Sequence, residues 1–211
     1  MRAMASVTIA ATYGAGGSVV APTVAQRLGL HLIERVIPVS LAQRLAQTRE
    51  VVLAEDERRE GPQVTRILTR AISTSGLFVG VPLHHTEIGL DERVAATEQA
   101  LRRVADAEGA VILGRAGVFV LAGRKDTLHV RLDGPREARL RQAIRHEGID
   151  EATAAGQQAE TDRARAAYVR HFHPGLRWED PAHYHLWLDS TVISLDACVD
   201  LVVGAARDLF G

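Results

Sequence analysis

The 211-residue chain has one cysteine, one lysine and no long apolar run. Its single cysteine, Cys198, excludes an internal disulfide. No stretch reaches the roughly 18 consecutive apolar residues that a membrane-spanning helix needs, and the first residues lack the apolar core of a secretory signal. These absences predict a soluble, cytoplasmic protein with no membrane partner.

Strong net charge is absent as well. The formal net charge is −1, and charged residues make up 24 % of the chain, so no overall basic surface points to nucleic acid. The only lysine is Lys125, and every other basic residue is arginine. Any anion site in this chain must therefore use arginine side chains and backbone amides. We expect small-molecule partners and no nucleic acid.

Short apolar, β-branched runs alternate with helical patterns along the chain. We predict strands at 6–11, 109–115, 127–133 and 184–189, and "LHLIER" is consistent with one more short strand. Strands that alternate with helices favour a parallel sheet with right-handed crossovers. The predicted fold class is α/β, a three-layer parallel sheet in a single domain of residues 1–211.

The middle third departs from a minimal three-layer domain. Residues 38–106 form a long, charged segment with a helical pattern, which ends in "LDERVAATEQALRRVAD". We predict a helical insertion at 38–106, a candidate acceptor-binding subdomain over the crevice, within a core of 4–37 and 107–211. Later helices are expected in "PREARLRQAIRHEG", which opens with Pro135 and closes with Gly148, in "EATAAGQQAETDRARAAYVRHF" and in "SLDACVDLVVGAARDLF".

The stretch "ATYGAGGS" lies between the first predicted strand and a helix. A phosphate cradle needs converging backbone N–H groups, residues that tolerate positive φ, and a helix N-terminus. Against the pattern G-x-x-x-x-G-K-S/T, Ala11 stands for the first glycine, Gly16 for the second, Gly17 for the lysine and Ser18 for the hydroxyl. The stretch predicts a phosphate-binding loop, with a ligand-free tight turn as the alternative.

Several segments together resemble the cytidylate kinase-like family of nucleoside monophosphate kinases. In that family the loop commonly carries a tyrosine, a glycine, a small residue and two glycines without the lysine. The matching residues here are Tyr13, Gly14, Ala15, Gly16 and Gly17. "LIERVIP", "VILGRAGVFVL", "LHVRLDGPREARLRQAIR" and "ETDRARAAYVRHFHPGLRWEDPAHYHLWLDS" are similar to later family segments. The resemblance covers nearly the whole chain except the middle third, and it implies the P-loop nucleoside monophosphate kinase type of fold.

The resemblance implies transfer of the ATP γ-phosphate to a pyrimidine nucleoside monophosphate, CMP or dCMP, with Mg²⁺. Phosphoryl transfer depends on positioning and on neutralising charge, which arginine does well. Candidate catalytic residues are Arg115, Arg163, Arg139 and Arg141. Candidate ATP-binding residues are Tyr13, Gly14, Ala15, Gly16, Gly17 and Ser18. Candidate substrate-binding residues are Glu34, Arg35, Gly114, Asp162 and Arg165. A solvated helix face is the alternative role for any single arginine.

Two further expectations concern the metal and a lid. Ser18 is the natural Mg²⁺ ligand, as the hydroxyl that follows the loop. Glu34 and Asp162 are candidate carboxylate helpers, with salt bridges as the alternative, and Asp189 is either a site residue or a strand-end cap. Residues 148–162 are rich in small and polar side chains, which predicts a mobile lid over the phosphate.

Other readings stay open. The pairs His171/His173 and His183/His185 have a spacing that, in a strand, places both imidazoles on one face for zinc or nickel. A catalytically inactive nucleotide-binding regulatory or interaction protein is the main functional alternative, and a kinase for another small acceptor is a third. The oligomeric state is open between a monomer and a homodimer.

Overall fold

The computed structural model describes residues 5–34, 90–114 and 116–211. In these residues five parallel strands form one sheet in the order β2-β3-β1-β4-β5. The strands are β1 (Ser6–Ala11), β2 (His31–Glu34), β3 (Ala110–Leu113), β4 (Thr127–Asp133) and β5 (Leu186–Asp189). The predicted α/β class, its four main strands and the short strand after the first helix are confirmed.

The described helices largely follow the sequence signals. They are α1 (Gly17–Leu28), α5 (Leu90–Ala107), α6 (Ala116–Val120), α7 (Arg136–Glu147), α8 (Glu151–Phe172), α9 (Leu195–Phe210) and the 3-10 helix η1 (Pro181–His183). Gly29 and Gly148, both with φ of 66°, end α1 and α7 as left-handed caps. The short α6 was not predicted. None of the helices in the described ranges combines the length and the apolar character needed to cross a membrane.

The predicted insertion is described only at its end. Helix α5 confirms the last helix expected in 38–106, whereas residues 35–89 and their predicted position over the crevice lie outside the described residues. The division of the chain into core, insertion and lid stays a prediction.

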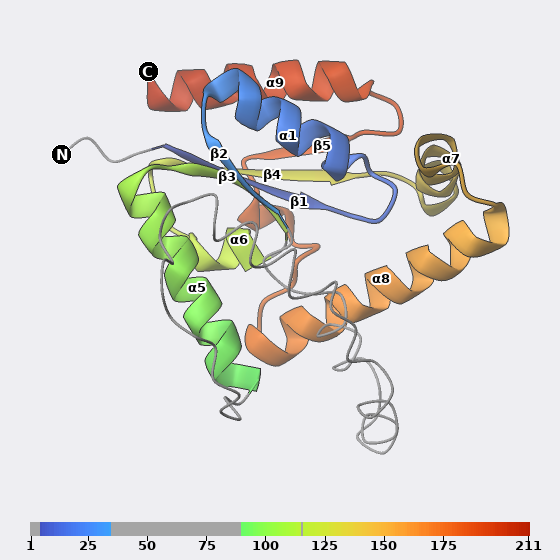
Figure 1. Cartoon of the computed structure of the whole chain (residues 1–211), viewed down its shortest axis with the longest axis horizontal. Helices are drawn as coiled ribbons and strands as arrows, with labels where there is room; N and C mark the ends of the chain where they lie inside the picture. The colour runs from blue at the N-terminus through green and yellow to red at the C-terminus, as the bar shows by residue number, and fades with distance from the viewer. Residues whose placement is uncertain (1–4, 35–89, 115) are drawn as a thin grey trace, which may run out of the picture.

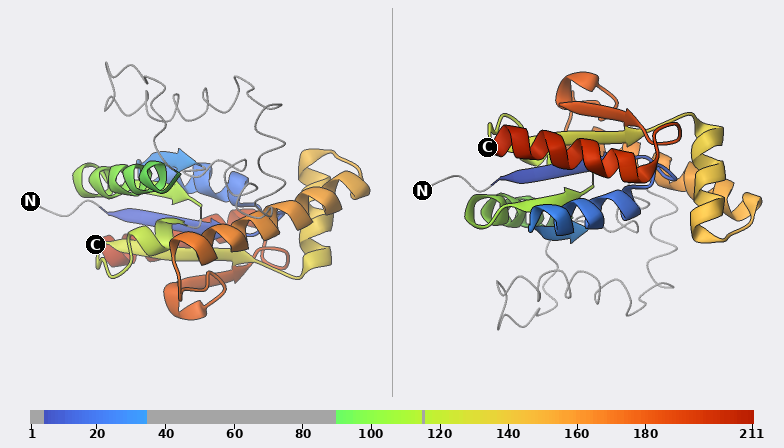
Figure 2. Two further views of the ribbon diagram at one scale, coloured as in Figure 1. Left: turned by 90° about the horizontal axis from the view of Figure 1, so that it is seen from below. Right: turned by 90° about the horizontal axis from the view of Figure 1, so that it is seen from above.

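Helices cover both faces of the sheet (Figures 1 and 2). Helices α1 and α9 lie over one face, and α5, α6 and α8 lie over the other. Val7, Ile9 and Val130 are fully buried under α1 and α9. Ile112 belongs to the core on the opposite face, with residues of α5, α6 and α8. The sheet is thus the middle layer of three, and α7 lies beyond the C-terminal ends of the strands.

Strand β4, next to the central strand β1, carries polar residues on one face. Leu128, Val130 and Leu132 belong to the core beneath α1 and α9. Because side chains alternate along a strand, the intervening residues project from the other face. These residues are Thr127, His129, Arg131 and Asp133. The row ends at Asp133, next to the loop that follows β1.

Candidate phosphate-binding site

The glycine-rich loop joins the central strand β1 to α1. Ligands of open α/β sheets bind outside the carboxyl ends of the strands, where this loop lies. Gly14 and Gly16 have φ of 77° and 73°, which L side chains rarely adopt. A Cβ on Gly14 would lie 2.2 Å from the Arg139 carbonyl oxygen, and one on Gly16 would lie 2.5 Å from Cδ2 of Leu195. Both positions therefore require glycine.

Several loop amides point away from protein acceptors. The amide of Thr12 donates to the Leu132 carbonyl (3.2 Å), that of Ala15 to the Thr12 carbonyl (3.1 Å), and that of Tyr13 to Asp162 Oδ1 (3.3 Å). Within the described ranges, no protein acceptor takes the amides of Gly14, Gly16, Gly17 and Ser18. The first turn of α1 contains no acidic residue. Unsatisfied amides at a helix N-terminus attract an anion such as a phosphate group.

Packing at Gly17 explains the missing lysine. Gly17 is buried, and a Cβ built on it would lie 2.6 Å from Ala11 Cβ and 3.1 Å from Leu113 Cδ1. The Ala11 methyl group therefore occupies the space where a side chain at position 17 would begin. A loop with lysine at this position needs the smaller glycine at position 11. The two departures from the G-x-x-x-x-G-K-S/T pattern compensate each other.

Five side chains of alternating charge lie beside the loop. We call them the charge network, and in order they are Arg131, Asp133, Arg139, Asp162 and Arg165. The successive N···O distances are 2.6, 3.7, 3.1 and 3.8 Å. With three arginines and two aspartates, the network has a net charge of +1. It extends from β4 through α7 to α8.

The charge network contacts the loop at three consecutive residues. Asp133 Oδ1 accepts the Thr12 hydroxyl (2.8 Å). Arg139 Nη1 donates to the Tyr13 carbonyl (2.7 Å), and Arg165 Nη1 donates to the Ala11 carbonyl (3.0 Å). These bonds satisfy groups on the outside of the loop, so they fix its shape while the amides listed above remain available for a ligand.

Two arginines of the network are held mainly by protein groups. Arg131 stacks over Trp178, with its guanidinium carbon 3.9 Å from the ring centroid, and donates to the Trp178 carbonyl (2.7 Å). Arg139 donates to the Gly134 carbonyl (2.9 Å) in addition to its contacts with Tyr13 and Asp162. The structure therefore places Arg139, a predicted catalytic residue, under the loop as part of its support.

Tyr13 connects the loop to the α7–α8 junction. Its hydroxyl oxygen lies 2.8 Å from Glu147 Oε2 and 2.7 Å from Gln157 Oε1. Partial burial and the Glu147 carboxylate raise the pKa of Tyr13 to about 12, so the phenol stays neutral. Gln142 Nε2 adds a bond to the Gly14 carbonyl (3.0 Å). The predicted lid at 148–162 is therefore joined to the loop, and its mobility stays a prediction.

The other predicted site residues that the structure describes are not members of the charge network. Those with exposed side chains are Ser18, Glu34, Arg141 and Arg163. Gly114 follows β3 with φ of 147°, and its amide donates to the Ile9 carbonyl (2.9 Å). Arg35 and Arg115 lie outside the described residues. Asp189 accepts the amide and hydroxyl of Thr191, as a strand-end cap does.

Sequence analysis missed four supporting residues of the loop: Thr12, Arg131, Asp133 and Gln142. The strict alternation in "TLHVRLD" was the available signal for the two residues of β4, because it gives that strand one polar face. Gln142 had no comparable signal, since the side of α7 that meets the loop depends on tertiary packing.

The contacts described for the paired histidines are with other protein groups. His173 Nε2 lies 3.4 Å from Glu98 Oε1, and burial lowers the pKa of this histidine. His183 packs edge-on against Phe119, and His185 Nδ1 accepts the His129 amide. In the part of the chain that the structure describes, no group of three or more His, Cys, Asp or Glu residues has a metal-binding arrangement.

A central Gly-rich loop in a parallel sheet of order 2-3-1-4-5 defines a P-loop kinase fold of the nucleoside monophosphate kinase type. A crystal structure of an uncharacterized protein from Eubacterium ventriosum ATCC 27560 is similar, with a TM-score of 0.62 and 17 % identity over 97 % of this chain and 99 % of that one. A gluconokinase from Sinorhizobium meliloti 1021 gives a TM-score of 0.51 and 17 % identity over 99 % and 95 % of the two chains.

The Cytidylate kinase-like family model matches residues 6–192, so the chain belongs to this family. This confirms the resemblance seen in the sequence. A uronate isomerase from Corynebacterium glutamicum is 34 % identical over 109 residues, which is 50 % of this chain and 20 % of that protein. The chain thus spans about a fifth of the length of this curated relative.

Proposed function

We propose that this chain transfers the γ-phosphoryl group of ATP to a pyrimidine nucleoside monophosphate, CMP or dCMP. The observation that carries the proposal is the loop at residues 12–18, which combines available amides, a helix N-terminus and a rigid outer support. Membership of the cytidylate kinase-like family supports the acceptor class. ATP would place its β- and γ-phosphates against the amides of Gly14, Gly16, Gly17 and Ser18.

The reaction needs little covalent help from the protein. An oxygen of the acceptor phosphate forms a new bond to the γ-phosphorus, and the bond between this phosphorus and the β–γ bridging oxygen breaks. ADP leaves with that electron pair, and the acceptor becomes a diphosphate. The acceptor phosphate is already ionised, so the main requirements are in-line positioning and stabilisation of negative charge. The loop amides supply fixed dipoles for this purpose.

Magnesium fits the residues near the loop. Mg²⁺ in kinase sites usually takes one or two protein oxygens, and phosphates and waters complete its octahedron. Ser18, exposed at the second residue of α1, would supply that hydroxyl oxygen. The bound ion would neutralise charge that develops on the β- and γ-phosphate oxygens.

A nucleotide-binding protein without transfer activity is the second candidate. It is favoured by the lack of any basic side chain in residues 11–18 and by the protein acceptors that hold Arg139. Such a protein binds ATP through the same amides and acts through conformational change or association. The two candidates differ in turnover, not in nucleotide affinity.

A coupled assay of ADP release tests the proposal. The acceptor panel is CMP, dCMP, UMP and AMP, with gluconate as a non-nucleotide comparison. Transfer is expected with CMP and dCMP, and it should require Mg²⁺. Specific ATP binding without turnover on any acceptor would replace the proposal by the inactive reading. Turnover on gluconate alone would place the chain among kinases of other small acceptors.

A further inference from the structure

The loop itself supplies dipoles but no positive charge. None of residues 11–18 is basic, and packing at Ala11 excludes a lysine at Gly17. A triphosphate nevertheless needs a cation near its β- and γ-oxygens, where the negative charge is concentrated. In the described structure, the arginines that contact the loop backbone are Arg139 and Arg165.

Exposure distinguishes the arginines of the charge network. The side chains of Arg131 and Arg139 are 2 % and 9 % exposed, and that of Arg165 is 28 % exposed. Arg139 uses Nε and Nη1 on carbonyl groups and on Asp162. Arg165 is therefore the member of the network with the most surface available to a ligand.

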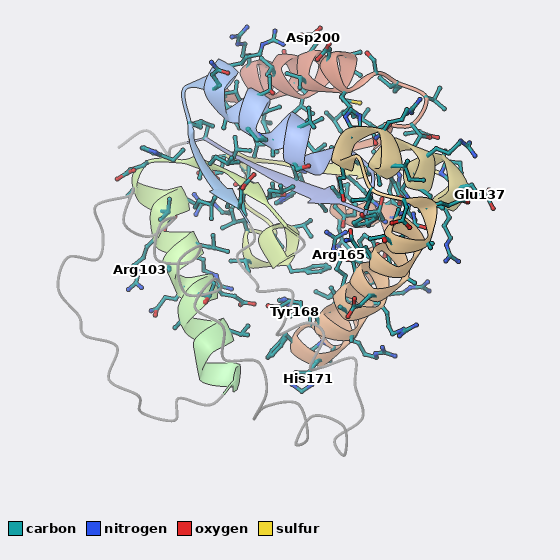
Figure 3. The ribbon with its side chains drawn as sticks, turned by 45° about the vertical axis from the view of Figure 1, so that its right-hand side comes forward. Arg103, Glu137, Arg165, Tyr168, His171 and Asp200 are labelled. Carbon is teal, nitrogen blue, oxygen red and sulfur yellow. The ribbon has the colours of Figure 1, made fainter. Side chains whose placement is uncertain are left out.

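Arg165 contacts the residue that excludes the lysine. Its Nη1 donates to the carbonyl of Ala11, the same residue whose methyl group fills the start of a side chain at Gly17. A cation from α8 thus contacts the end of β1, where the loop begins. Figure 3 shows Arg165 on α8, with Tyr168 and His171 farther along the helix.

We propose that Arg165 supplies, from α8, the charge that a lysine supplies in loops of the G-x-x-x-x-G-K-S/T pattern, by contacting the β- or γ-phosphate of the bound triphosphate. This inference rests on the proposed function for its ligand. A guanidinium has five donors in a planar fork, so it can bond to Ala11 and to phosphate oxygens together. Asp162, 3.8 Å away, orients the group.

Calorimetric titration of the full chain with sodium tripolyphosphate tests this assignment. Arg165→Ala should weaken binding by about 10- to 100-fold, as expected for loss of charge-assisted hydrogen bonds. Arg165→Gln should weaken it similarly, although glutamine keeps a donor for the Ala11 carbonyl. Arg170→Ala, five residues later on α8 and exposed, is the matched control and should change affinity less than threefold. Circular dichroism establishes that each variant is folded, and Arg165→Gln decides the matter if Arg165→Ala unfolds.

Equal losses in the Arg170 and Arg165 variants, or wild-type affinity in Arg165→Gln, would overturn the assignment. A wild-type chain that binds no tripolyphosphate would overturn it too. The titration contains no acceptor, so it tests phosphate binding separately from transfer. If the wild-type chain binds tripolyphosphate but phosphorylates no acceptor in the coupled assay, only the proposed function is refuted. The comparison of the Arg165 and Arg170 variants still decides the inference in that case.

Discussion

Gly17→Ala should destabilise the protein, although alanine normally stabilises a helix relative to glycine. The usual gain is about 1 kcal/mol in a helix interior. At Gly17 the new methyl group would lie 2.6 Å from Ala11 Cβ, which is too close for two carbon atoms. Overpacking of this kind costs about 1–3 kcal/mol. We expect a net loss of about 1 kcal/mol, or a decrease in Tm of about 2–4 °C for a chain of this size.

Gly204→Ala on α9 is the matched control for this experiment. Gly204 is exposed, and a Cβ there has no heavy atom within 4 Å, so the variant should gain up to about 1 kcal/mol. Urea denaturation of both variants gives the comparison. Ala11→Gly combined with Gly17→Ala should recover part of the loss. A Gly17→Ala variant as stable as Gly204→Ala would refute the packing explanation for the missing lysine.

Three further outcomes are expected. Asp133→Asn leaves the buried Arg131 without its carboxylate partner and should lower the free energy of unfolding by about 3–5 kcal/mol, measured by urea denaturation. Asp200→Asn, in an exposed ion pair with Arg27, is the control and should lower it by less than about 1 kcal/mol. Burial and then the neighbouring His185 lower the pKa of His129 to about 4. The unfolded histidine titrates near 6.5, so protonation favours the unfolded chain. The free energy of unfolding should therefore be highest above pH 6.5 and should decrease as the pH falls from 6.5 toward 4. A His129→Gln variant should show a flatter pH dependence of Tm. Tyr13→Phe should increase hydrogen exchange in residues 148–162 by up to about tenfold, and unchanged exchange would argue against the hydroxyl as the tether.

The strands of this fold were predictable because each is a short apolar run bounded by a turn. "SVTIAA" is buried at all six positions, as a central parallel strand should be. The end of α7 was equally clear, since Gly148 adopts the left-handed conformation that glycine favours, and Gly29 ends α1 in the same way. Helix α6 was missed because five residues are too few to show a helical period.

The candidate site was only partly predictable. Clustered glycines indicate a backbone with positive φ, and Gly14 and Gly16 do adopt it in the turn. The sequence does not show which arginine meets the loop. Arg163 and Arg165 are two residues apart on α8, yet only the second contacts the loop backbone, because the side of the helix that packs inward is set by tertiary contacts. The sequence likewise does not show that Ala11 and Gly17 pack against each other, because this contact depends on how β1 meets the start of α1.

Transfer of label from γ-³²P-ATP to CMP tests the central claim most directly. The products of the wild-type chain with Mg²⁺ are separated by chromatography and compared with those of the Arg165→Ala variant. We expect labelled CDP from the wild type, and a rate lower by about 10²–10³ in the variant, as for the loss of one preorganised charge donor. Bound ATP with no labelled diphosphate from CMP, dCMP or UMP would contradict the claim.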